Sequence, residues 1–252
     1  VVDYGFIINN GLEAYEKQIS DELENEPDSE YLMAMKKSLD CVSFLLRRTD
    51  AFLEEKYSQV GKADKAKISE LRRIISKVPF KPAEDFREAV QAVWIIHFMI
   101  PLADNAWYSI SLGRFDSYMY PFYKSSIEKG VSKAEIKSIL KNFYELLNNY
   151  ADGACLMNVG PVYNEFSEFL IECQKDFALP APILGARIDT NTPEHIWNAL
   201  IDEKLFSMGQ PTFYGEDACV NALVEKGITR EKALKFSNNS CISLQKGNNI
   251  FL

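Results

Sequence analysis

The sequence predicts an α-rich fold of the α/β class. Apolar residues recur at helical spacing through most of the chain, and strand-like segments occur only late. The 252 residues are 47% hydrophobic, which is enough to bury one large core or two smaller ones. Because no internal repeat or Gly/Ser-rich linker divides the chain, we expect residues 1–252 to belong to one domain.

Several of the predicted helices have recognisable ends. Ser29 and Ser132 are expected to cap helices, and Glu135 follows the second cap at capping-box spacing. Pro101 should end a helix that is apolar nearly all round from Val90 onward and is therefore buried. The expected helices are 11–58 (two helices broken at 26–29), 62–77, 83–100, 116–128, 132–150, 164–175, 192–208, 216–226 and 229–237.

Two segments are strand candidates, Ile183–Ile188 and Gln210–Gly215. Residues 104–114 are expected to be extended or looped, and residues 151–163 to form a loop. A polar turn, Asn238–Ser240, follows the last helix. Periodicity leaves open whether the strands pair with each other or with a chain segment beyond this sequence.

Composition excludes some classes of function. The net charge of -8 and the lack of a basic stripe argue against nucleic-acid binding. The longest apolar run, Ala92–Leu102, is too short to span a bilayer and contains His97. No signal peptide opens the chain. Val1 is not a start methionine, so we expect a piece of a longer protein.

The cysteine pattern predicts reduced thiols in a cytoplasmic protein and no zinc site. The five cysteines are widely spaced and form no Cys-x-x-Cys pair or Cys/His cluster. Four of them are expected to fill the core. The fifth, Cys241, lies among small polar residues. The cysteines are Cys41, Cys155, Cys173, Cys219 and Cys241.

Other titratable residues have simpler, structural interpretations. His97 lies on an apolar helix and is expected to be a core histidine. Arg114 and Asp116 are expected to form a structural ion pair or a helix cap. Glu216 and Asp217 open a predicted helix, where the helix dipole accounts for their charge.

Three stretches together resemble the glycyl radical enzymes, which include pyruvate formate-lyase, diol dehydratases and choline trimethylamine-lyase. They are Pro82–His97, Ser109–Lys124 and the segment from Arg187 to Ile242. The resemblance runs from about Tyr4 to Cys241. It implies a barrel of two half-barrels wrapped by helices, to which this chain supplies outer helices and a few strands of one half-barrel. The family's N-terminal helical part and C-terminal glycyl radical loop have no counterpart here.

The resemblance also implies a chemistry. In that family an S-adenosylmethionine-dependent iron–sulfur activase places a radical on a backbone glycine, and a cysteine thiyl radical attacks a small substrate. Cys241 matches that cysteine. The thiol must be neutral and dry, and the sequence carries no charge from Asn238 up to Lys246. The resemblance further implies anaerobic metabolism, a homodimer of the full-length protein, and no cofactor or metal bound by this chain.

By the same resemblance, the residues expected to contact substrate are Asn105, Trp107, Tyr108, Ser109 and Ser243. For the two aromatic residues, Trp107 and Tyr108, core packing is the alternative. Among the expected contacts, two depart from known classes. Tyr108 stands where diol dehydratases have a histidine. Ser243 stands where dehydratases, choline-lyases and decarboxylases have a proton-transferring glutamate, and a serine hydroxyl is not a general base at neutral pH without help.

Three hypotheses remain open at this point. The first is the catalytic-core fragment of a glycyl radical enzyme, inactive in isolation, of the pyruvate formate-lyase transferase type or the lyase and dehydratase type. The transferase family has serine at the position of Ser243, but it has a second cysteine where this chain has Ser240. The second hypothesis is a radical-inactive relative that serves in binding or assembly. The third is a conventional cysteine enzyme, in which Cys241 would alkylate readily.

Overall fold

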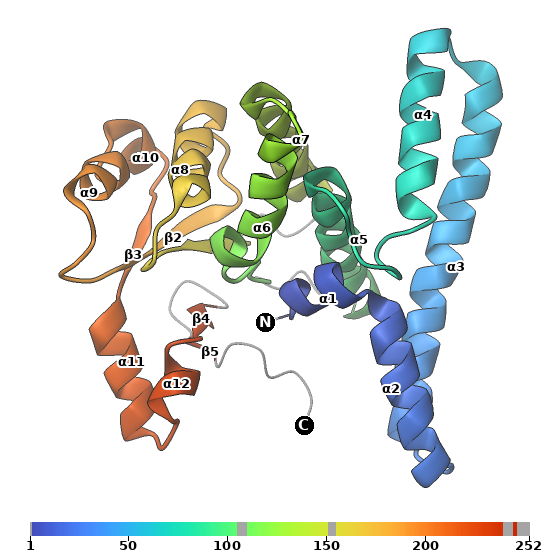
Figure 1. Cartoon of the computed structure of the whole chain (residues 1–252), viewed down its shortest axis with the longest axis horizontal. Coiled ribbons are helices and arrows are strands. Elements are labelled where there is room, and N and C mark those ends of the chain that lie inside the picture. The colour runs from blue at the N-terminus through green and yellow to red at the C-terminus, as the bar shows by residue number, and fades with distance from the viewer. Residues whose placement is uncertain (1, 105–109, 151–154, 239–243, 246–252) are drawn as a thin grey trace. The chain divides into compact units, whose positions relative to one another are not determined.

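The computed structural model describes residues 2–104, 110–150, 155–238 and 244–245, and helices dominate it (Figure 1). The helices are α1 (Tyr4–Asn10), α2 (Leu12–Asn25), α3 (Glu30–Gln59), α4 (Lys62–Ile75), α5 (Phe86–Asp104), α6 (Phe115–Glu128), α7 (Lys133–Tyr150), α8 (Glu165–Phe177), α9 (Glu194–Leu200), α10 (Glu203–Ser207), α11 (Glu216–Glu225) and α12 (Arg230–Ala233). The strands are β1 (Leu156–Val159), β2 (Ile183–Ile188), β3 (Thr212–Gly215), β4 (Ser237–Asn238) and β5 (Leu244–Gln245). The chain forms two compact units, Gly5–Met99 and Ile100–Leu252 with Val1–Tyr4.

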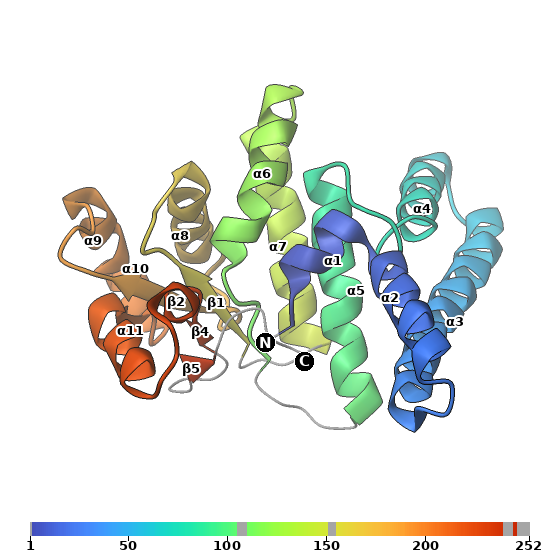
Figure 2. The same cartoon turned by 60° about the horizontal axis from the view of Figure 1, so that its bottom comes forward.

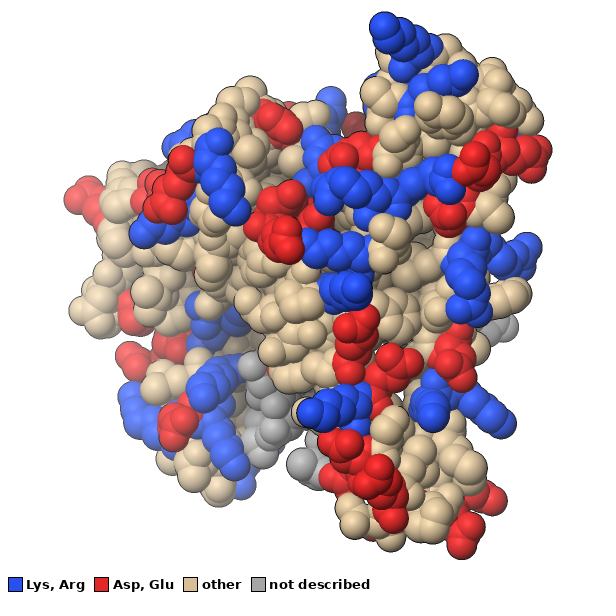
Figure 3. Space-filling view, turned by 45° about the vertical axis from the view of Figure 1, so that its right-hand side comes forward, with Lys and Arg blue, Asp and Glu red and all other residues tan. Residues whose placement is uncertain are grey.

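The unit Gly5–Met99 is helical. Its buried carboxylate, Glu88, accepts hydrogen bonds from Arg73 at 2.8 Å and Lys77 at 2.7 Å, which ties the end of α4 to the start of α5. The predicted break before α3 is confirmed, although the Ser29 side chain makes no capping hydrogen bond. On the face drawn in Figure 3, Lys and Arg side chains are interspersed with Asp and Glu.

Helix α5 corrects one prediction from the sequence. It continues past Pro101 to Asp104, so the proline does not end it. A proline inside a helix removes one backbone hydrogen bond and its ring clashes with the carbonyl of residue i−4, which can kink a helix without ending it. His97 is fully buried on α5, as predicted. None of the described helices is long and apolar enough to cross a membrane.

The second unit is built on a parallel sheet in the order β1-β2-β3, so the late strands pair with each other. Helix α8 connects β1 to β2, and α9 and α10 connect β2 to β3, as parallel pairing requires. Residues 112–113 run along the other edge of β1, where Leu112 N donates to Leu156 O at 2.8 Å. Figures 1 and 2 show α8, α9 and α10 on one side of this sheet and α11, α12, β4 and β5 on the other.

Three predictions about this unit were wrong. Residues 151–163 are not only a loop, because they contain β1, a strand of four residues that is buried on both faces and so shows no alternation. The helix predicted over 192–208 is two helices, separated where Asp202 caps α10 by accepting from Lys204 N. The last predicted helix ends at Ala233, because residues 237–238 form β4.

Aromatic side chains from α6, α7 and α8 form the core on the helical side of the sheet. Phe115 stacks on Phe143 with ring centroids 5.9 Å apart, and Tyr123 lies 4.8 Å from Phe166. All four rings are buried or nearly so. Such rings contribute large apolar areas, so this layer holds the sheet rigid against the helices.

Candidate functional site

The face of the sheet opposite these helices carries polar side chains. Neighbouring strands pair Asn158 with Gly185 and Arg187 with Tyr214, and residues two apart on a strand share a face. Side chains on this face bind the backbone of the segment Leu234–Asn238. We call Arg187, Glu216 and Asn158, with the backbone groups they hold, the anchor cluster.

Arg187 of β2 is fully buried and forms a two-pronged ion pair with Glu216, the first residue of α11. Arg187 Nε donates to Glu216 Oε2 at 2.8 Å, and Nη2 donates to Oε1 at 2.6 Å. Burial lowers the pKa of Arg187, but a guanidinium stays protonated in proteins. The helix dipole alone is therefore an incomplete account of Glu216, whose main partner is Arg187.

Arg187 also holds the chain that leads toward Cys241. Its Nη1 donates to Phe236 O at 2.9 Å, and its Nη2 donates to Leu234 O at 3.1 Å. The guanidinium carbon lies 3.8 Å from the centre of the Phe236 ring, which is a cation–π distance. One side chain thus orients α11 and the end of α12 against β2.

Asn158 of β1 holds the same chain four residues after Leu234. Its Oδ1 accepts from Asn238 N at 3.1 Å. A Cβ atom at Gly185 would lie 2.7 Å from Asn158 Nδ2, which is closer than real contacts allow. Glycine on the neighbouring strand is therefore what leaves room for the Asn158 amide.

The residues around Asn158 carry polar atoms with unused hydrogen-bonding capacity. Asn158, Ser237 and Asn238 are buried, yet Asn158 Nδ2, Ser237 Oγ and both side-chain polar atoms of Asn238 have no partner among the residues that the structure describes. Buried polar groups in proteins are nearly always hydrogen-bonded. These atoms can therefore serve polar groups outside the described ranges.

The predicted catalytic and substrate-binding residues lie outside the described residues. This holds for Cys241 and for the expected substrate contacts Asn105, Trp107, Tyr108, Ser109 and Ser243. Strands β4 and β5 precede and follow residues 239–243 in the sequence. These strands pair antiparallel, with Ser237 opposite Gln245 and Asn238 opposite Leu244. The two ends of the segment that contains Cys241 and Ser243 are therefore held together.

The predicted pair of Arg114 and Asp116 is confirmed as structural. Arg114 Nε lies 3.4 Å from Asp116 Oδ1, and the buried Asp116 also accepts from Gly160 N at 2.8 Å. Burial raises the pKa of Asp116, although Arg114 and these hydrogen bonds oppose that shift. The carboxyl fixes the turn that follows β1.

The four described cysteines differ in exposure. Cys155 and Cys173 are buried, Cys219 is half-buried, and all four described cysteines are thiols rather than disulfides. Burial raises the pKa of Cys173 to about 12, so its thiol is neutral. The prediction that four cysteines fill the core was wrong for Cys41, which is exposed on α3. Within the described ranges, no group of three His, Cys, Asp or Glu side chains could hold a metal ion.

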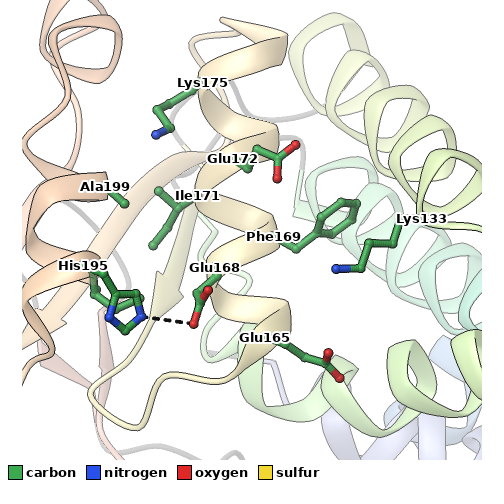
Figure 4. A pocket seen from close by; sticks show the side chains of 10 residues that line it. Lys133, Glu165, Glu168, Phe169, Ile171, Glu172, Lys175, His195 and Ala199 are labelled. Atoms are coloured by element: carbon green, nitrogen blue, oxygen red, sulfur yellow. Dashed lines mark hydrogen bonds and ion pairs between the residues drawn. The ribbon is translucent and has the colours of Figure 1, made fainter.

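A charged hollow of about 360 Å³ lies over α8 on the helical side of the sheet (Figure 4). His195 of α9 reaches Glu168 of α8 at 3.3 Å, and Lys133 and Lys175 lie on its rim. Both members of the His195–Glu168 pair are more than half exposed. This hollow therefore lacks the buried polar groups of the anchor cluster.

Comparison with known proteins places the chain in a family. The family described as "Pyruvate formate lyase-like" matches residues 1–251. Isethionate sulfite-lyase of Bilophila wadsworthia is 26% identical over 98% of this chain and 34% of its own length. Trans-4-hydroxy-L-proline dehydratase of Clostridioides difficile is 24% identical over 92% of this chain and 31% of its own length.

Solved structures agree with that placement. The glycerol-bound B12-independent glycerol dehydratase of Clostridium butyricum superposes with a TM-score of 0.84 and 26% identity, over 98% of this chain and 35% of its own. A glycyl radical enzyme of Archaeoglobus fulgidus superposes with a TM-score of 0.85 and 24% identity, over 98% and 36%. The chain therefore belongs to the pyruvate formate lyase-like family of glycyl radical enzymes. It spans about a third of the length of these relatives.

The anchor cluster was not predicted from the sequence, although one signal was present. Arg187 is a charged residue inside the apolar strand Ile183–Ile188, and a buried charge requires a partner. The partner groups lie 29 to 49 residues further along the chain. No local pattern links them.

Proposed function

We propose that this chain carries the radical-transfer cysteine of a glycyl radical enzyme, and that this cysteine is Cys241. The observation that carries the proposal is the anchor cluster. Buried side chains from two strands fix the backbone up to Asn238, three residues before Cys241. Restraint of the backbone by several buried side chains supports a reactive site nearby in the chain, where the position of the reacting group matters. The family match over residues 1–251 supports the radical chemistry.

In the proposed reaction, the S–H bond of Cys241 breaks homolytically and its hydrogen atom passes to a glycyl radical of the full-length protein. The resulting thiyl radical takes a hydrogen atom from a carbon of the substrate. The S–H bond is restored, and an unpaired electron is left on that carbon. An S-adenosylmethionine-dependent iron–sulfur activase is the proposed partner that generates the glycyl radical. A cytoplasmic, anaerobic homodimer is the proposed setting.

The proposed substrate is a small polar metabolite, and the proposed reaction is a lyase or dehydratase reaction. The names of the relatives support this, since they refer to isethionate, hydroxyproline and glycerol. Buried amide and hydroxyl groups of Asn158, Ser237 and Asn238 support a polar ligand nearby. Asn105, Trp107, Tyr108, Ser109 and Ser243 remain the proposed contacts. The acyl-transferase reaction is less well supported because Ser240 replaces the second cysteine.

The test is anaerobic activation of the full-length protein by its activase, followed by electron paramagnetic resonance. We expect a doublet from the glycyl radical. The Cys241→Ala variant should keep this doublet and lose turnover by a factor of at least about 10³, as loss of a covalent catalyst does. Full turnover in Cys241→Ala would remove the cysteine from the mechanism.

A radical-inactive relative that serves in binding is the second candidate function. Ser243 favours it, because the dehydratase and lyase classes use a glutamate at that position for proton transfer. The same experiment separates the two candidates. A full-length protein that shows no doublet with a competent activase would support the inactive relative.

A further inference from the structure

We infer that Arg187, Glu216 and Asn158 are positioning residues for hydrogen-atom transfer, in addition to being structural residues. The inference rests on the proposed function of Cys241. Its basis is that three contacts hold backbone atoms of one short segment, Leu234–Asn238, from two different strands of the sheet.

The contacts act on the backbone, so they fix the register of this segment whatever its side chains are. Leu234 O and Phe236 O are held by Arg187, and Asn238 N is held by Asn158. A segment held at both ends and in the middle can neither slide along the sheet nor rotate. The parallel sheet beneath it is covered on its other side by the aromatic core, so the support is rigid.

Such restraint matters for the chemistry that follows in the chain. Asn238 and Cys241 are three peptide units apart, and each unit spans 3.8 Å between Cα atoms. A shift at Asn238 therefore changes the point from which the chain carrying Cys241 starts. Reactions that depend on close approach of the reacting atoms lose about 10²-fold in rate for a misplacement of about 1 Å. A folding role alone would not require such restraint three residues before the reacting group.

Glu216 contributes to the restraint of Leu234–Asn238 indirectly, through Arg187. Without the carboxylate, the guanidinium would keep its two carbonyl partners but would lose the fork that fixes its plane. We therefore expect Glu216→Gln to loosen the segment, and Arg187→Lys to do the same because an ammonium group is a point donor.

The test needs no knowledge of the substrate. In deuterated water the thiol of Cys241 becomes S–D. Transfer of that deuterium to the glycyl carbon and re-abstraction of the original hydrogen leave deuterium on the radical carbon, so the doublet collapses. The rate of collapse in the full-length, activated protein therefore measures hydrogen transfer between the two residues. Only folded protein that carries the radical contributes to it.

Three variants probe this restraint. We expect Asn158→Ala to slow the collapse by at least about 10-fold, on the sensitivity given above. Gly185→Ala should slow it as well, because its Cβ displaces the Asn158 amide without removing any polar group. Asn158→Asp should restore much of the rate, since a carboxyl oxygen can still accept from Asn238 N.

Matched controls distinguish position from stability. Asn148 likewise bonds another segment's backbone, donating to Ala181 O at 2.6 Å and accepting from Ala181 N, but before β2. Glu88 is a buried, ion-paired carboxylate like Glu216, in the other unit. Asn148→Ala and Glu88→Gln should leave the collapse rate within about twofold of wild type, because neither touches Leu234–Asn238.

The outcomes separate the two proposals. If wild type collapses, Cys241→Ala does not, and Asn158→Ala and Gly185→Ala collapse at the wild-type rate, the positioning inference is wrong and the role of Cys241 stands. Equal slowing in the control variants would also overturn it. If wild type shows a doublet that never collapses, or Cys241→Ala collapses normally, the proposed function itself fails.

Discussion

The hydrogen-bond partners of Arg187 explain its burial better than its ion pair with Glu216 does. A buried ion pair is often no more stabilising than well-packed apolar side chains of the same size. Stability alone is therefore a weak reason for placing Arg187 and Glu216 inside the protein. An apolar pair could not bind the carbonyl oxygens of Leu234 and Phe236, and these bonds are what the guanidinium adds.

His97 provides a residue-scale prediction about pH. Burial lowers its pKa to about 4 from an ordinary 6.5. Between these values the unfolded chain binds a proton that the folded chain does not, so stability is lost as pH falls through this window. Across the whole window, the free energy of unfolding falls by about 3 kcal/mol, at 1.36 kcal/mol per pKa unit.

Replacing the imidazole tests whether His97 causes this loss of stability at low pH. In His97→Gln, the loss of stability between pH 6.5 and pH 4 should shrink by about that amount, because the titrating group is gone. Hydrogen exchange of peptides from α5, measured at several pH values, gives the free energy of opening. An unchanged pH dependence in the variant would assign the acid sensitivity to other groups, such as Glu88.

At the scale of elements, the first turn of α8 fixes where this helix begins. Asn164 Oδ1 accepts from Phe166 N and Ser167 N, both at 2.9 Å, and Ser167 Oγ accepts from Asn164 N. This is a complete capping box, and it fixes where the helix leaves the loop after β1. The position of α8 over the sheet depends on that exit.

We expect Asn164→Ala to destabilise α8 by about 1 kcal/mol, the usual cost of removing such a cap. Asn164→Asp should be nearly neutral, since it keeps the acceptor oxygen and places a negative charge at the helix N-terminus. Hydrogen exchange in peptides covering residues 164–177 measures both. A loss as large in Asn164→Asp as in Asn164→Ala would mean that the cap is not the stabilising feature.

At the scale of the whole molecule, thiol reactivity tests which kind of cysteine chemistry the protein supports. With iodoacetamide at neutral pH, Cys41 should react first because it is exposed, whereas Cys155 and Cys173 should be protected by burial. Cys241 should react slowly, as a neutral thiol would. Peptide mass spectrometry follows each site. Rapid alkylation of Cys241 alone would favour a conventional nucleophile over a thiyl radical.

Much of the fold could be predicted from local pattern. The apolar run of β2 was predicted over Ile183–Ile188, the bounds it has in the structure. Most helices were predicted because each is long enough for the helical period of apolar residues to recur several times. The four-residue strand β1 was missed because a short segment buried on both faces has no period. The end of α5 was misplaced because a proline can kink a helix without ending it.

The candidate site was less accessible from the sequence. The family resemblance pointed to Cys241 and its predicted neighbours, which lie outside the described residues. The anchor cluster was missed because Arg187 meets Glu216 and the Leu234 carbonyl only after the chain has folded back over the sheet. Such contacts are set by topology, and no spacing in the sequence encodes them.

The sheet order has a consequence for synthesis on the ribosome. Strands β1, β2 and β3 and their connecting helices occupy the continuous stretch from residue 156 to residue 215. The three-stranded platform can thus assemble before residues 234–238 have left the exit tunnel, because chains fold from the N-terminal side as they emerge. During that interval the Arg187 guanidinium lacks its carbonyl partners at Leu234 and Phe236, so this segment docks onto a charged surface that was formed before it was released.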